Sequence, residues 1–178
     1  MRVFIGVDFC KKAKLSIYER TDLFKENQHG HRVPCENYHL TLKYIGEVNG
    51  ETLDRFINYF KTFKLPQHAF EVTFDGIDIF ESSKSKPVFL KPQTAPKALN
   101  ELYQRIENET VEFGFKPLVQ TFRPHITLAR KVKQCFQFPI AVEPLIIPID
   151  NVTLFESKRV NGLLRYIPVV KKRLEECV

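Results

Sequence analysis

The order of strands and helices in this sequence predicts a mixed fold of two similar lobes, with helices outside and a cleft between the lobes. Three observations support this prediction. Apolar and polar residues alternate over several short segments, and two longer segments have apolar residues at helical spacing. A His-x-Thr-x strand also occurs once in each half, at His39 and at His125. The simplest arrangement of such a repeat is a pseudo-two-fold axis, which would bring the two motifs together across the cleft.

The length and composition are those of one compact domain. The chain has 178 residues and 16 phenylalanines, enough to bury a sizeable core. We predict a single domain, 1–178, with lobes of about 1–85 and 86–178 that are able to exchange strands. The net charge of +6 weakly favours a polyanionic partner. Four scattered cysteines, a strand-like start and the lack of a long apolar run favour a cytoplasmic protein without membrane association.

The first half of the chain is predicted to contain three strands and two helices. β-Branched and aromatic residues predict a strand over 2–9, and helical spacing predicts a helix over about 11–26. The first motif strand follows at 38–45. A strongly amphipathic helix then begins near Asn49, and a strand over 70–79 bends or bulges at Gly76. The apolar stripe of that helix comprises Leu53, Phe56, Ile57, Phe60 and Phe63.

The second half repeats this order with a weaker second helix. A strand is predicted over 87–92, and a helix follows with Thr94 as its candidate N-terminal cap and Gly114 at its C-terminal end. The second motif strand lies at 122–129. Further apolar strand segments precede a hairpin turn at Asn161-Gly162. The apolar face of the helix comprises Leu99, Leu102, Ile106 and Phe113, and the later strand segments are 145–147 and 152–155.

The two motifs carry groups that suit acid–base chemistry on a phosphate ester. Alternation along a strand places His39, Thr41 and Lys43 on one face, with Leu40, Leu42 and Tyr44 on the core face. His125 and Thr127 likewise share a face. One histidine can take a proton from attacking water while the other gives a proton to the leaving oxygen. The threonine hydroxyls can hold the other phosphate oxygens, and a strained cyclic phosphate would need neither a metal nor a nucleophilic side chain.

The segments that carry these motifs resemble a known family. Residues 39–46 and 122–130 resemble the paired signature of the 2H phosphoesterases, and more narrowly the RNA 2′,3′-cyclic phosphodiesterases, historically called 2′-5′ RNA ligases (LigT-like). The first strand and the closing hairpin, 154–168, extend the resemblance over nearly the whole chain. It implies an α+β fold of two pseudo-symmetric lobes, with antiparallel sheets lining a central cleft and helices outside. It also implies hydrolysis of RNA 2′,3′-cyclic phosphate ends to 2′-phosphates without cofactors, and a capacity for the reverse 2′-5′ ligation.

The resemblance assigns roles to the motif residues. His39 would be the proton donor and His125 the proton acceptor, although the near symmetry of the motifs leaves this order open on spacing alone. Thr41 and Thr127 would bind the phosphate. Arg130 matches a family position linked to phosphate binding, but alternation places it on the site face only if the strand ends or bulges near Ala129. Further candidates for substrate contacts are Lys43 for positive potential, Arg123 as a rival of Arg130, and Tyr166 or Phe4 for base stacking.

Other functions fit the sequence less well. A zinc site built from Cys35, His39, His125 and Cys135 matches no closed zinc pattern, and the neighbouring threonines are poor zinc ligands. A small substrate, such as a cyclic ADP-ribose phosphate or a 2′-5′ oligonucleotide, would keep the same fold, whereas the basic balance favours RNA. An RNA-binding module without turnover would not need two intact acid–base groups. Nothing in the sequence indicates an obligate protein partner.

Overall fold

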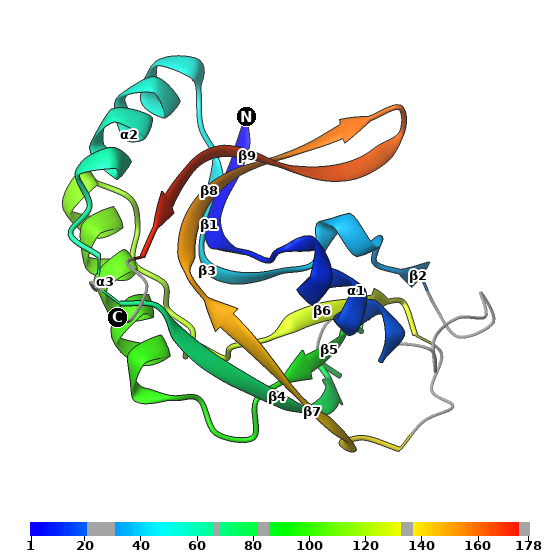
Figure 1. Cartoon of the computed structure of the whole chain (residues 1–178). Coiled ribbons are helices and arrows are strands. Elements are labelled where there is room, and N and C mark those ends of the chain that lie inside the picture. Colours follow the sequence, from blue (N-terminus) through cyan, green and yellow to red (C-terminus); the bar gives the residue numbers. More distant parts are fainter. Residues whose placement is uncertain (21–30, 66–67, 82–85, 133–136, 175–178) are drawn as a thin grey trace.

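The computed structural model describes residues 1–20, 31–65, 68–81, 86–132 and 137–174 (Figure 1). Within these ranges the chain forms three α-helices and two antiparallel sheets, which confirms the predicted α+β fold. In chain order the elements are β1 (Arg2–Asp8), α1 (Lys11–Glu19), β2 (His31–Arg32), the 3-10 turn η2 (Cys35–Asn37), β3 (His39–Glu47), α2 (Gly50–Thr62), β4 (Phe70–Ile79), β5 (Val88–Lys91), α3 (Lys97–Phe113), β6 (Ile126–Arg130), β7 (Ile140–Ile149), β8 (Asn151–Val160) and β9 (Leu163–Arg173).

Each sheet takes strands from both halves of the chain. The four-stranded sheet has the order β3-β1-β8-β9, and the five-stranded sheet has the order β2-β6-β5-β4-β7. A boundary near residue 85 therefore does not separate the two sheets, because strands are exchanged between the halves. The two motif strands, β3 and β6, belong to different sheets and still approach each other within 8 Å between Cα atoms. This approach brings the two motifs to one place in the fold.

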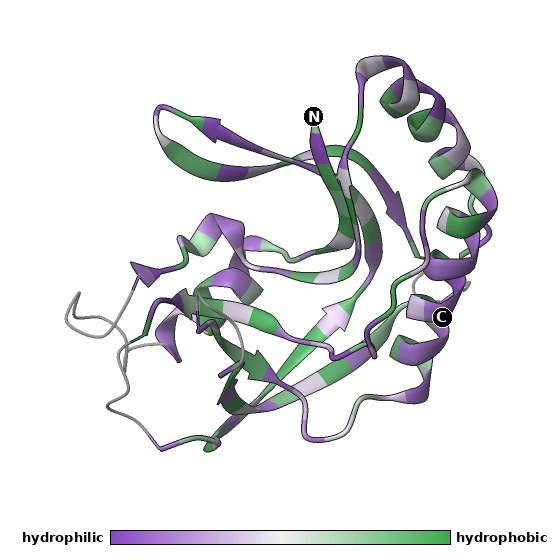
Figure 2. Cartoon of the chain, turned by 180° about the vertical axis from the view of Figure 1, so that it is seen from behind, coloured by the Kyte–Doolittle hydropathy of each residue, from purple (hydrophilic) through white to green (hydrophobic). Residues whose placement is uncertain are grey.

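The helices α2 and α3 lie together on the outside of the molecule (Figure 1). Aromatic rings join them, because the ring of Phe56 on α2 lies 4.9 Å from that of Phe113 on α3. Hydrophilic and hydrophobic residues alternate along both helices, as expected for helices with one buried face (Figure 2). Leu53, Phe56 and Phe60 of the predicted stripe are buried in the core together with β1, β3 and β8.

The ends of the helices and the turns agree with the sequence at most places. Asn49 caps α2, since its side chain accepts a hydrogen bond from Thr52 N at 2.8 Å. Gly114 ends α3 in the left-handed conformation, with φ of 111°. The predicted cap Thr94 is wrong: α3 begins at Lys97 behind Pro96, whose fixed φ suits the start of a helix without a side-chain cap. The turn at Asn161-Gly162 has positive φ at both residues and joins β8 to β9 as predicted.

One further expectation is met in part and another is confirmed. The predicted helix over 11–26 is helical over α1, and its segment 21–26 lies outside the described residues. The predicted irregularity in the strand over 70–79 is confirmed by a register shift between Phe74 and Gly76.

Cys10 and Cys35 are free thiols, while Cys135 and Cys177 lie outside the described residues. In the described part of the chain, every helix is too short or too polar to span a membrane.

Candidate active site

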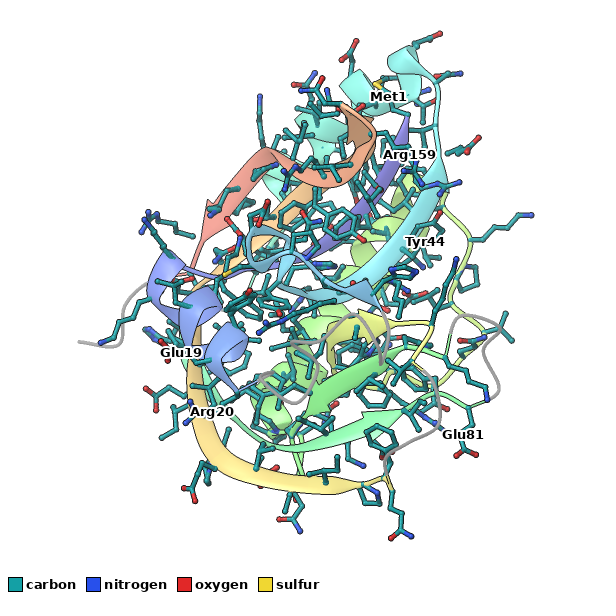
Figure 3. All side chains as sticks on the ribbon, turned by 90° about the vertical axis from the view of Figure 1, so that its right-hand side faces the viewer. Met1, Glu19, Arg20, Tyr44, Glu81 and Arg159 are labelled. Carbon is teal, nitrogen blue, oxygen red and sulfur yellow. The ribbon has the colours of Figure 1, made fainter. Side chains whose placement is uncertain are left out.

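A β-bulge in β3 decides which residues of the first motif face outward. Thr41 lies opposite Gly6 of β1, and Lys43 lies opposite Ile5, so Leu42 is an extra residue on β3. The extra residue reverses the alternation. Leu42 and Lys43 are consequently both buried, whereas Tyr44 is 51% exposed on the face shown in Figure 3.

This bulge corrects two expectations. Lys43 was expected on the face of His39, as a source of positive potential for RNA; its side chain is 1% exposed and its ammonium is paired with Glu107. Tyr44 was expected in the core and instead lines a groove beside Thr41. Lys43 therefore does not present its charge to a ligand, and Tyr44 is a surface residue of the site that the alternation did not predict.

The second motif strand has a β-bulge at the same position relative to its histidine. Phe89 of β5 lies opposite Thr127, and Val88 lies opposite Ala129, so Leu128 is the extra residue on β6. Leu128 and Ala129 are both buried, and Arg130 returns to the outer face. This is the bulge on which the prediction for Arg130 depended. Burial is the main cause of the lowered pKa of both His39 and His125, and the positive charge of Arg130 lowers both values further.

Hydrogen bonds fix the ring of His39 from both sides. Its Nδ1–H donates to the carbonyl oxygen of Asn37 at 2.7 Å, and its Nε2 lies 3.0 Å from Thr41 Oγ1. Asn37 is itself buried, and its side-chain amide donates to the carbonyl of Leu164 on β9 at 2.9 Å. The tautomer of His39 is thus set by the backbone, which leaves Nε2 as the nitrogen that exchanges protons.

The surroundings of His39 favour its neutral form. Its ring lies 4.8 Å from that of Phe4, 5.9 Å from that of Phe155 and 4.7 Å from that of Tyr166. Burial among these rings lowers the pKa of His39 to about 4, against the opposing effect of the hydrogen bond to the Asn37 carbonyl. In the free protein at neutral pH, Nε2 of His39 is therefore an acceptor for the Thr41 hydroxyl.

His125 repeats this arrangement in a more open setting. Its Nδ1–H donates to the carbonyl oxygen of Arg123 at 2.7 Å, the same two-residue offset that joins His39 to Asn37. The rings of Phe80 and Phe89 lie 5.2 and 5.3 Å from its ring. Burial lowers the pKa of His125, opposed by the Arg123 carbonyl and assisted by the charge of Arg130. In both rings Nδ1 is thus bonded to a backbone carbonyl, which leaves Nε2 as the candidate nitrogen for proton transfer.

One groove contains residues from both motifs. It has a volume of about 890 Å³, and its walls include Thr41 of β3 and His125 in front of β6. A second cleft of about 470 Å³ shares Phe80, Phe122 and Arg123 with it. The remaining lining residues of the larger groove are Leu42, Tyr44, Pro87, Leu118, Val119, Gln120 and Thr121. A phosphate in this groove would meet an imidazole from one motif and a hydroxyl from the other.

The other predicted site residues, His39, Thr127, Arg130 and Tyr166, are not among the residues that line this groove. Thr127 is half-buried in β6, two residues after His125. Tyr166 of β9 lies with its ring edge against His39, and Phe4 is 4% exposed beneath the same ring. Phe4 therefore supports His39 from the core rather than offering a free face to a base. Among the described residues there is no group of three or more His, Cys, Asp or Glu side chains that could hold a metal ion.

The sequence did not reveal the groups that orient the two histidines. The carbonyls of Asn37 and Arg123 stand at the same offset before each histidine, and a comparison of the two motifs could have suggested an equivalent role. It also did not reveal the segment 118–121 as a wall of the groove. That segment has no motif, and its role follows only from its position in the fold.

The fold and the site define a class of protein: two antiparallel sheets, each with a His-x-Thr strand, that bring both motifs to one groove. The family model of the 2′-5′ RNA ligase superfamily matches residues 14–159. The chain therefore belongs to this superfamily, and the family resemblance stated from the sequence is confirmed.

Curated relatives and solved structures agree with this assignment. The RNA 2′,3′-cyclic phosphodiesterase of Escherichia coli is 25% identical over 175 residues, which cover 98% of this chain and 97% of the relative. The protein of the same name from Thermotoga maritima is 27% identical over 178 residues, which cover 99% and 95%. The crystal structure of E. coli LigT complexed with 3′-AMP has a TM-score of 0.83 at 24% identity and covers 97% of both chains, which shows the shared fold.

Proposed function

We propose that this protein hydrolyses RNA 2′,3′-cyclic phosphate ends to 2′-phosphomonoesters by two-histidine acid–base catalysis. The observation that carries the proposal is the paired geometry of His39 and His125. In each ring, Nδ1 is tied to a backbone carbonyl two residues earlier, and Nε2 is left for proton transfer. The relatives named RNA 2′,3′-cyclic phosphodiesterase, which match nearly the full chain, support this substrate.

The proposed reaction breaks the bond between phosphorus and the 3′ oxygen. Nε2 of His125 takes a proton from water as the water oxygen attacks phosphorus. Nε2 of His39 gives a proton to the departing 3′ oxygen, which becomes a hydroxyl. The 2′ oxygen stays bound to phosphorus, so the product is a 2′-phosphate. Each of these proton transfers typically contributes about 10²–10⁴ to the rate.

The non-bridging oxygens of the phosphate need donors during this step. The hydroxyls of Thr41 and Thr127 would supply hydrogen bonds, and the guanidinium of Arg130 would supply positive charge. These groups match the needs of a pentacoordinate phosphate without a metal ion. Tyr166 stands beside His39 at 4.7 Å between ring centroids and would contact the ribose or base of the terminal nucleotide.

His39 can act as the proton donor only if substrate binding converts its neutral ring into the protonated form. Burial holds the pKa of His39 at about 4 in the free protein, so the ring is neutral near pH 7. The negative charge of a bound phosphate favours the imidazolium form and raises this pKa. Substrate binding therefore charges the donor in our proposal. The expected 2′-5′ ligation would use the same groups: the 5′-hydroxyl of a second RNA would replace water as the nucleophile, the bond between phosphorus and the 3′ oxygen would break, and a 2′-5′ linkage would form.

Product analysis tests the proposal directly. A synthetic oligonucleotide with a 2′,3′-cyclic phosphate end and 2′,3′-cyclic AMP are each incubated with the protein in the presence of EDTA. We expect a 2′-phosphate product from the oligonucleotide, identified by ³¹P NMR against both isomers. A 3′-phosphate product would contradict the proposed bond cleavage. Hydrolysis of neither substrate, together with measurable RNA binding, would instead identify an RNA-binding module without turnover.

The reaction is assigned to the cytoplasm as part of the same proposal. The free thiols of Cys10 and Cys35 are consistent with a reducing compartment. The formal charge of +6 favours a polyanionic substrate over a neutral one.

A further inference from the structure

A buried ion pair connects the first motif strand to helix α3. The ammonium of Lys43 lies 2.9 Å from both carboxylate oxygens of Glu107, and the side chains are 1% and 10% exposed. Two charges withdrawn from water are stabilising only when further hydrogen bonds satisfy them. Here those further bonds go to the backbone of one loop: Lys43 Nζ donates to the carbonyl of Lys116 at 2.8 Å, and Glu107 Oε1 accepts from Leu118 N at 2.7 Å.

The loop that this ion pair holds continues along the chain into a segment that forms one wall of the groove. Residues 118–123, which we call the groove wall, all line the larger groove. One end of the groove wall is fixed at Leu118 by Glu107. Near the other end, the ring of Phe122 stacks on Tyr103 of α3 at 4.1 Å, and the carbonyl of Arg123 orients His125. The groove wall is thus held between two anchors that both involve α3.

Little else fixes the middle of the groove wall. Val119 is 99% exposed and Leu118 is 40% exposed, so neither side chain is held by burial in the core. Their apolar side chains line the same groove as Tyr44 of β3. Because Lys43 follows Thr41 across the bulge, a single ion pair ties the position of the groove wall to the position of the first motif.

The groove extends beyond the phosphate site. The larger groove of about 890 Å³ continues into the second cleft of about 470 Å³ through Phe80, Phe122 and Arg123. Ligand sites of about 300–1,000 Å³ hold one drug-sized molecule, so the larger groove has room for one such ligand and the adjoining second cleft adds further space. The two adjoining clefts therefore offer more space than the terminal nucleotide requires, and the rings of Phe80 and Phe122 together with the guanidinium of Arg123 suit the base and phosphate of another ribonucleotide.

We propose that Lys43 and Glu107 are positioning residues for oligonucleotide recognition. Their ion pair holds the Leu118 end of the groove wall, which contacts the nucleotide that precedes the cyclic phosphate end. The Arg123 end, whose carbonyl orients His125, is held separately by the stack of Phe122 on Tyr103, so the chemistry at the histidines does not depend on the ion pair. This inference rests on the proposed phosphodiesterase activity. It assigns the selectivity for RNA over a cyclic mononucleotide to a buried pair that never touches the substrate.

The test compares two substrates in one double variant. Lys43→Met/Glu107→Leu removes both buried charges together, an exchange that proteins often tolerate without loss of stability. We expect kcat/KM for a cyclic-phosphate-ended tetranucleotide to fall about tenfold, mainly through KM, while the value for 2′,3′-cyclic AMP stays within about twofold. The matched control is Lys97→Met/Glu101→Leu, which removes an exposed pair on the same helix and should change neither value.

A second variant keeps the inference testable if the first does not fold. Leu118→Ser/Val119→Ser alters exposed side chains of the groove wall and should produce the same selective loss for the tetranucleotide. Equal losses for both substrates in folded variants, or no loss for the tetranucleotide, would overturn the inference and leave a purely structural ion pair. An active wild type with such a result refutes this inference alone. A wild type that hydrolyses neither substrate refutes the proposed function and this inference with it.

Discussion

The two motif strands differ in their surroundings more than in their own geometry. The two sheets have equivalent strand orders: β3-β1-β8-β9 corresponds to β6-β5-β4-β7, and β2 is an additional strand beside β6. Each motif strand has a bulge after its threonine, and each histidine donates to a carbonyl two residues earlier. The residues at one equivalent position differ, however: the fifth residue after His39 is Tyr44, whereas the fifth residue after His125 is Arg130.

This difference shows how a repeat becomes an asymmetric site. His39 lies among the rings of Phe4, Phe155 and Tyr166 and is bonded to Thr41. The second motif strand instead ends with a guanidinium. Both histidines therefore have aromatic neighbours, three rings at His39 and two at His125, but only the second motif strand adds a charged residue at its end. Two groups of the same type acquire separate acid and base roles when their environments separate their pKa values.

The largest expected effect is the loss of either imidazole. In His39→Ala or His125→Ala, one proton transfer disappears while the surrounding sheet remains. We expect kcat to fall about 10²–10⁴-fold for each variant. Steady-state kinetics on a cyclic-phosphate-ended oligonucleotide measure the loss, and circular dichroism checks the fold. If either variant retains more than a tenth of the activity, that histidine is not an acid or base of the reaction.

A smaller effect is expected from the threonines, and it should distinguish the two motifs. Thr41→Val and Thr127→Val remove one hydroxyl each at nearly constant volume, with an expected loss of about 10²-fold in kcat for a phosphate donor. Within the described part of the chain, the hydrogen bond to the neighbouring histidine is present for Thr41 and absent for Thr127. Thr41→Val should therefore also alter the titration of His39, whereas Thr127→Val should leave that of His125 unchanged. Equal activity of a variant and wild type would remove that threonine from the site.

The smallest effect concerns the protonation states themselves. In ¹H–¹⁵N spectra of the free protein, His39 should titrate near pH 4, below its usual value of 6.5, because burial disfavours the imidazolium. Inorganic phosphate should raise the pKa of His39, since an anion stabilises the charged ring. Arg130→Gln should raise the pKa of both histidines, because it removes a nearby positive charge. A pKa of His39 that does not respond to phosphate would favour the reverse assignment of donor and acceptor.

Much of the fold could be predicted because its signals are local. The stripe of α2, the left-handed Gly114 and the turn at Asn161-Gly162 each depend on a few neighbouring residues. The paired motifs were also visible, since the repeat of His-x-Thr is a local pattern that occurs twice. The predicted strand over 122–129 was wrong in its first part, because β6 begins at Ile126 and His125 precedes it. These features are fixed by propensity and periodicity rather than by distant contacts.

The two β-bulges could not be predicted from local patterns in the sequence. One extra residue in a strand changes which face every later side chain occupies, and nothing in the alternation of Leu42, Lys43 and Tyr44 reveals it. Pairing with the partner strand decides the register, so the burial of Lys43 could not be predicted from the sequence of the motif. The pairing of Lys43 with Glu107 likewise joins residues 64 positions apart. Such contacts follow from the fold as a whole and not from the sequence near the motif.

The exchange of strands between the halves has a consequence during synthesis of the chain. β1 lies between β3 and β8, so the second edge of this amino-terminal strand has no partner until residues 151–160 leave the ribosome. An open strand edge is a site for unwanted pairing with other chains. A nascent or truncated chain that ends before residue 151 would expose that edge, and pairing of β8 with β1 covers it.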